Sequence, residues 1–109
     1  MKGTYLGEFE EVVLLTVAML DGAAYGINVK QAVEKRTDRT INLSVIHSTL
    51  YRLEKKGFLN SELGEATQIR GGKRKRYFSI NPYGVKSLKE ARALREGIWE
   101  AIPTYVLQQ

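Results

Sequence analysis

The sequence predicts an α+β protein that is mostly helical, with three helices, a β-hairpin and one long last helix. Apolar residues recur at helical spacing in four segments of the chain. Between the third and fourth of these, a basic segment changes into the alternation of apolar and polar residues that is typical of a strand. With 109 residues, the chain is long enough for one small hydrophobic core.

The first two helices are predicted from apolar spacing and from the signals at their ends. The segment from Glu8 to Leu20 has acids in its first turn, where the helix dipole favours them, and apolar residues almost all round. We therefore expect it to be the central and most buried helix, ending at Asp21. A second helix is expected from about Tyr25 to Lys35, and a polar break follows it.

The third helix should begin near Asn42 or Ser44, either of which can cap it, and end at Gly57. Residues at positions i, i+3, i+4 and i+7 form its inward face: Ile46, Thr49, Leu50 and Leu53. The opposite face carries hydroxyls, rings and cations: His47, Ser48, Tyr51, Arg52 and Lys55. Such a face can hydrogen-bond to base edges and phosphates, although an ordinary solvated helix would also present it.

The hairpin is predicted from Phe58 to Leu63 and from Arg74 to Ile80, with a loop between them. A Gly-Gly pair at 71–72 allows a sharp turn in the loop. Alternation places Phe78 with Ile80 on one face of the return strand. Five cations, with no acid among them, lie around the Gly-Gly turn and at the start of the return strand: Arg70, Lys73, Arg74, Lys75 and Arg76. A solvated surface is the alternative explanation for a basic run.

Asn81 and Pro82 should open the last helix, which we expect to run to about Ile102 and to stop at Pro103. An apolar stripe at spacings of three and four extends beyond the reach of a small core. Its members are Ala91, Leu94, Ile98 and Ala101, with Trp99 and Ile102 beside them. A homodimer would cover this stripe, and packing on the first helix of the same chain is the alternative.

Composition and charge narrow the range of functions that this protein can have. A formal charge of +5 and a pI near 9.6 suit a nucleic-acid partner. The absence of cysteine excludes disulfides and thiolate chemistry and suits a cytoplasmic protein. The apolar run from Val12 to Leu20 is shorter than the ~20 residues of a membrane span. His47 is the only histidine, and no convergent acid–base set is legible, so we expect no metal site, no cofactor, no catalytic residues and no enzyme activity.

A basic hairpin shortly after a helix with a polar outer face is typical of a winged helix-turn-helix, in which the helix enters a DNA groove and the hairpin reaches the neighbouring backbone. We therefore expect a DNA-binding unit over residues 1–80 and a dimerisation helix over 81–109, forming one compact unit. A ligand-sensing module or an RNA-binding module stays open as an alternative.

The sequence resembles the PadR-like bacterial transcriptional regulators over nearly its whole length. The similar pieces are Leu6 to Leu15, Tyr25-Gly26, Thr49 to Gly57, Gly64 to Thr67 and Arg70 to Phe78. The resemblance implies a repressor that is dimeric through its C-terminal helix, reads DNA with its third helix and uses the hairpin as a wing. It indicates the short subgroup, which has a single C-terminal helix.

Two positions differ from the family pattern. The family usually has a glycine near the start of the third helix and a tyrosine three residues later, where this sequence has Ser44 and His47. Some members of the subgroup bind flat aromatic ligands at the dimer interface through a tryptophan, and Trp99 lies about one turn beyond that position. A small aromatic effector at the dimer interface is thus a partner that the resemblance suggests.

Taken together, these patterns predict a homodimer that binds double-stranded DNA at a pseudo-palindromic operator. The predicted DNA contacts are Ser44, His47, Ser48, Thr49, Tyr51, Arg52, Lys55, Lys73, Arg74, Lys75 and Arg76. The predicted dimer interface consists of Leu88, Ala91, Leu94, Arg95, Ile98, Trp99 and Ile102.

Overall fold

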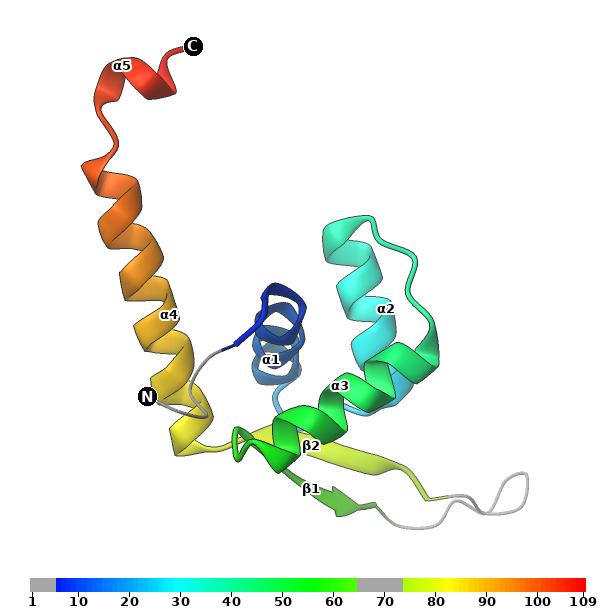
Figure 1. Ribbon diagram of the computed structural model, residues 1–109. Coiled ribbons are helices and arrows are strands. Elements are labelled where there is room, and N and C mark those ends of the chain that lie inside the picture. Colours follow the sequence, from blue (N-terminus) through cyan, green and yellow to red (C-terminus); the bar gives the residue numbers. More distant parts are fainter. Residues whose placement is uncertain (1–5, 65–73) are drawn as a thin grey trace.

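The computed structural model describes residues 6–64 and 74–109, and its elements follow the predicted order (Figure 1). Three helices pack beside a two-stranded hairpin, and a long fourth helix rises along one side of the molecule. The predicted α+β winged-helix class is confirmed. The bounds are α1 Glu8–Leu20, α2 Gly26–Thr37, α3 Leu43–Lys55, β1 Leu59–Leu63, β2 Arg76–Ile80, α4 Pro82–Ala101 and α5 Thr104–Leu107.

Helix α1 lies at the centre of the fold, between α4 on one side and α2 with α3 on the other (Figure 1). Its buried apolar side chains meet those of α2, α3 and the hairpin in one core. The expectation that α1 is central is confirmed, but it is not buried all round, because Leu15 and Met19 are 49% and 46% exposed. The fully buried side chains of this core include Val13, Leu14, Val17, Val29, Val33, Ile46, Leu50, Leu53, Phe58 and Phe78.

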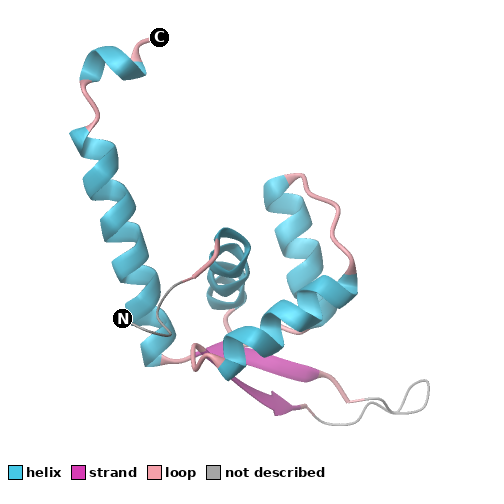
Figure 2. Cartoon of the chain, viewed as in Figure 1, coloured by secondary structure: helices cyan, strands magenta, loops and turns pink. Residues whose placement is uncertain are grey.

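The hairpin is antiparallel, with Leu59 opposite Ile80 and Leu63 opposite Arg76. Figure 2 shows that it lies along one edge of the helical core. Strand β2 is also anchored on its other side, because the Phe78 N–H donates to the Ala24 carbonyl over 2.8 Å. The predicted alternation is confirmed, since Phe78 is buried and Ser79 is exposed. The Gly-Gly turn and the cations at 70 and 73 lie outside the described residues.

The start of α4 is fixed by the cap that the sequence predicts. The Asn81 side chain accepts a hydrogen bond from the Gly84 N–H over 2.9 Å, and Pro82 occupies the first turn. Gly57, at the end of α3, has a positive φ of 91°, which glycine adopts without steric cost. Gly57 thus turns the chain from α3 into the hairpin, and Asn81 with Pro82 turns it from the hairpin into α4.

Gly84 is required where α4 meets the hairpin. A Cβ at this position would lie 2.5 Å from the Phe58 carbonyl oxygen and 2.7 Å from Ile80 Cγ1. Because the nearer atom belongs to the backbone, it cannot move aside cheaply. We expect Gly84→Ala to lower the free energy of unfolding by about 1–3 kcal/mol, the usual range for overpacking. Urea denaturation of the two proteins would measure the difference, and equal stability would show that α4 is held less closely than the structure indicates.

Helix α4 extends well past the core that its first turns cover. It packs on α1 along its earlier turns, whereas its last turns rise clear of α1, α2 and α3 (Figure 1). The predicted break at Pro103 is confirmed, but a further short helix, α5, follows it. None of the helices within residues 6–64 and 74–109 is long and apolar enough to cross a membrane.

Candidate nucleic-acid interface

The outer face of α3 presents the polar side chains that the sequence places there. Ser44, His47, Ser48, Tyr51, Arg52 and Lys55 are all exposed, while the apolar residues of the inward face are buried. The rings of His47 and Tyr51 stack with centroids 6.5 Å apart, and Tyr51 meets the edge of Phe78 at 5.8 Å. These ring contacts tie the outer face of α3 to the wing strand. Contact between these residues and DNA stays a prediction.

Thr49 does not belong to this outer face. Its side chain is 1% exposed, and its hydroxyl donates to the Val45 carbonyl over 2.8 Å. The prediction of a DNA contact at Thr49 is therefore wrong. Helical spacing already put this residue in the inward set with Ile46 and Leu50, and the structure confirms that spacing.

A cleft of about 580 Å³ separates the start of α2 and the outer face of α3 from the wing. The Lys75 ammonium lies 4.2 Å above the centre of the Tyr25 ring, within reach of a cation–π contact. On the other side, the His47 ring lies directly on Gly26, where a Cβ would come within 2.5 Å of its Cε1. Sequence reasoning noted Tyr25-Gly26 as part of a family motif but did not bring it next to the wing.

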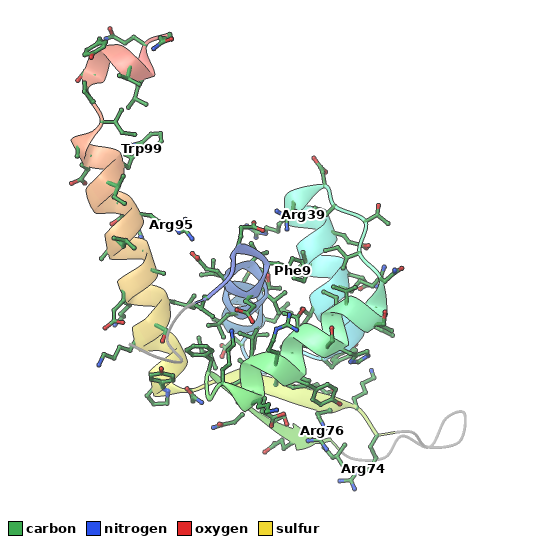
Figure 3. The ribbon with its side chains drawn as sticks, viewed as in Figure 1. Phe9, Arg39, Arg74, Arg76, Arg95 and Trp99 are labelled. Carbon is green, nitrogen blue, oxygen red and sulfur yellow. The ribbon has the colours of Figure 1, made fainter. Side chains whose placement is uncertain are left out.

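Two of the wing cations, Arg74 and Arg76, are held in place by hydrogen bonds to uncharged groups. Arg74 donates from Nε to the Gly64 carbonyl over 2.7 Å, and Arg76 donates to the Ser61 hydroxyl over 3.0 Å. Figure 3 shows Arg74 and Arg76 at the end of the hairpin that leads toward its tip. No carboxylate of residues 6–64 or 74–109 forms an ion pair with Arg74, Lys75 or Arg76. Lys73, also a predicted contact, lies outside the described residues.

Arg52 has a partner that the sequence did not reveal. Its Nε donates to the carboxylate of Glu10 on α1 over 2.9 Å, and Lys56 donates to the same carboxylate over 2.9 Å. The Glu10 side chain is only 9% exposed. Burial alone would raise the pKa of Glu10, but hydrogen bonds from the Gly7 N–H, Lys56 and Arg52 together lower it below its usual value. Glu10 is therefore ionised at neutral pH.

The other acids of the first α1 turn bind different elements. Glu8 pairs with Arg39, which follows α2, over 2.9 Å, and Glu11 pairs with Arg95 of α4 over 2.7 Å. Arg39 also lies over the Phe9 ring, at the end of the molecule away from Arg74 and Arg76 (Figure 3). The acids that the sequence assigns to the helix dipole thus also connect α1 to three other parts of the chain.

The apolar stripe of α4 is exposed over its C-terminal half. Leu94, Ile98 and Trp99 are 65%, 62% and 61% exposed, whereas Leu88 packs against the core of its own chain. Arg95 lies level with α1, and Trp99 lies beyond it, near the break before α5 (Figure 3). Packing on the first helix of the same chain, one of the two alternatives, therefore accounts for the first turns of α4 but leaves Leu94, Ile98 and Trp99 exposed. Cover of these residues by a second copy stays a prediction. Ala91 and Ile102, the other predicted interface residues, are half-buried.

No group of His, Cys, Asp and Glu side chains that could hold a metal ion occurs among the described residues. The candidate interface combines the outer face of α3, the start of α2 and the wing, which line the same cleft.

A helix with a polar outer face beside a cationic hairpin, both carried on a three-helix core, defines a DNA-binding winged-helix protein. The sequence also matches the transcriptional regulator PadR-like family over residues 14–90, and the chain belongs to this family. The predicted family is therefore confirmed. No curated protein matches the sequence.

Solved structures of regulators share the fold. A PadR-like transcription factor from Bacteroides fragilis is 23% identical, with 84% of each chain covered and a TM-score of 0.73. A PadR-like regulator from Bacillus cereus is 19% identical, with 93% of this chain and 92% of that chain covered, and has a TM-score of 0.71. A PadR family regulator from Clostridium difficile is 15% identical over 90% and 98% of the chains, with a TM-score of 0.70.

Proposed function

We propose that this chain is a repressor that binds a pseudo-palindromic operator as a homodimer, with α3 in the major groove and the wing on the adjacent backbone. The observation that carries the proposal is the placement of the exposed α3 face beside wing cations that have no carboxylate partner in the described part of the chain. Side chains on α3 would read base edges, and the wing would fix the register through phosphates.

The assembly is argued from α4. A row of apolar side chains more than half exposed, on a helix that rises clear of its own domain, needs a covering partner. A second copy related by two-fold symmetry supplies the same row, and it would present a second α3 to the other half of the operator. Tyr105 and Leu107 of α5 extend the exposed apolar surface and are further candidates for this interface.

Repression is proposed from the resemblance to the family. A dimer bound to an operator within a promoter would prevent RNA polymerase from binding there. The direct test is transcription in vitro from a template carrying a site selected from random duplexes. Loss of transcript on adding the protein supports repression, and an increase would reverse the sign of the regulation.

Binding to duplex DNA should weaken steeply with salt. Each phosphate that a cation neutralises contributes about −0.9 to the slope of log K against log salt concentration. Gel shifts at several salt concentrations would measure the slope for duplex DNA, structured RNA and single strands side by side. A flat response would contradict the role of the wing, and a preference for RNA would favour the RNA-binding alternative.

Trp99 offers an internal probe of assembly, because it is the only tryptophan and is 61% exposed in the single chain. If α4 pairs with its copy, dilution below the dissociation constant should transfer the indole to water and shift its emission to longer wavelength. An effector that is flat and aromatic, bound beside Trp99 in the dimer, should quench the same emission. Emission that is unchanged over the whole dilution range, with the dimer shown to dissociate, would remove Trp99 from the interface.

A further inference from the structure

The carboxylate of Glu10 is buried behind the recognition helix and is fully occupied by donors. Oε2 accepts from Arg52 Nε and from Lys56 Nζ, both over 2.9 Å. Oε1 accepts from Lys56 Nζ over 3.0 Å and from the Gly7 N–H over 2.9 Å. Glu10 belongs to α1, the central helix of the core. Its carboxylate therefore holds the side chains of Arg52 and Lys56, at the end of α3, in a defined position relative to the core.

The arrangement leaves part of Arg52 free for another partner. The guanidinium has five N–H groups, of which Nε–H is used on Glu10 and one Nη2–H points toward Thr49 Oγ1 at 3.5 Å. The Arg52 side chain is still 50% exposed. Its end-on edge can therefore donate two parallel hydrogen bonds outward, which is the geometry that recognises guanine in the major groove.

Besides orienting Arg52, the carboxylate of Glu10 lowers the net charge at the end of α3. Arg52 and Lys56 carry two positive charges at the C-terminal end of α3, and Glu10 reduces the sum to one. An unpaired cation attracts every phosphate regardless of sequence, whereas a directed pair of hydrogen bonds depends on the base that it meets. Neutralising charge while keeping the donors oriented thus shifts the contribution of α3 from general attraction toward base discrimination.

We propose that Glu10 is a specificity-determining residue of the DNA interface: it positions the Arg52 guanidinium and suppresses sequence-independent attraction by Arg52 and Lys56. It acts through α3 and is a positioning residue, since its buried carboxylate does not itself reach DNA. This inference rests on the proposed binding of duplex DNA by α3.

The test is Glu10→Gln, which preserves shape and can still accept from the Gly7 N–H. Its amide carries no charge, so the net positive charge that Arg52 and Lys56 offer to phosphates rises from one to two. Affinity for a random duplex should rise, and the salt slope should steepen by about 0.9 for one further neutralised phosphate. When the salt concentration is lowered from 1 M to 0.1 M, the non-specific affinity of the variant should therefore rise by about eightfold more than that of the parent. The ratio of specific to non-specific affinity should fall by about fivefold or more as Arg52 loses its orientation.

Glu8→Gln is the matched control, because it removes the same charge from the same helical turn but releases Arg39, which lies away from the wing. It should leave the specificity ratio unchanged. The double variant Glu10→Gln with Lys56→Gln should return the salt slope to that of the parent while the ratio stays low, since Arg52 is still unheld. Lys56→Gln alone should fold and should keep the ratio of the parent, because Glu10 still holds Arg52.

The outcomes separate this inference from the proposed function. A parent protein with no preference for any duplex would overturn the proposed function. A parent that discriminates, beside a folded Glu10→Gln with the same slope and the same ratio, would overturn the role of Glu10 alone. A uniform fall of specific and non-specific affinity would likewise overturn it, because that pattern indicates a purely structural residue.

Discussion

Replacing Ile98 with Asp should convert the proposed homodimer into a monomer and remove most of its affinity for the proposed operator. Ile98 is 62% exposed in the single chain, so the substitution leaves the folded domain intact and acts on assembly. In a dimer, it would bury an unpaired carboxylate among Leu94, Trp99 and their copies, which costs several kcal/mol. A monomer then engages one half-site and loses the gain from linked binding.

Sedimentation of the variant beside the parent measures the first effect, and titration of a full operator against a half-site measures the second. Ala93→Asp is the matched control, because Ala93 is exposed and helical spacing puts it on a different face of α4, little more than a turn away. It should stay dimeric and keep its affinity. A parent that is already monomeric at micromolar concentration, or an Ile98→Asp protein that is still dimeric, would remove α4 from the proposed assembly.

The order and type of the main elements were predictable because each has its own local signal. Asn81 and Pro82 mark the start of α4, Gly57 marks the end of α3, and alternation fixes which face of β2 is buried. The boundaries shift by one or two residues, since the hydrogen bonds of the hairpin rather than composition decide that β2 begins at Arg76 instead of Arg74. Helix α5 was not predicted because a four-residue helix after a proline has too few residues to show periodicity.

The candidate site was predictable only as a set of exposed residues. Spacing on α3 separates His47 and Ser48 from the core, and the structure confirms their exposure. What spacing could not provide is the partner of each cation, because Glu10 precedes Arg52 by 42 residues in the chain and their meeting depends on how α1 packs on α3. An acid near the inward face of a central helix is the only local hint of such a pair, and it does not say which cation the acid meets.

The packing of Tyr25 and Gly26 shows the same limit. These two residues mark the start of α2 in the sequence, but the chain between them and Lys75 spans nearly half of the molecule. The contact forms because the segment before α2 pairs with β2 through Ala24 and Phe78. This bridge brings the start of α2 next to the wing, so the Tyr25 ring and the Lys75 ammonium meet across one end of the cleft.

The wing and α3 should make different contributions to binding, and paired substitutions would separate them. Replacing Arg74 and Lys75 together by Ala should weaken binding to every duplex alike. The salt slope should become shallower by about 0.9 for each phosphate that is no longer neutralised. Both residues are exposed and have no carboxylate partner among the described residues, so their removal leaves no buried group unpaired.

Ser48→Ala is the better counterpart on α3 than Arg52→Ala, because losing Arg52 would also remove a partner of the buried Glu10. The Ser48 hydroxyl is exposed and donates to the Val45 carbonyl of its own helix over 3.1 Å. Its removal should cost about 1 kcal/mol on the preferred sequence and almost nothing on a random duplex. Both variants should be titrated against the preferred and the random duplex at two salt concentrations. The wing variant should change the salt slope and keep the ratio of specific to non-specific affinity. Ser48→Ala should keep the salt slope and lower this ratio. If both variants lowered the two affinities in the same proportion, α3 would not be the element that reads the sequence.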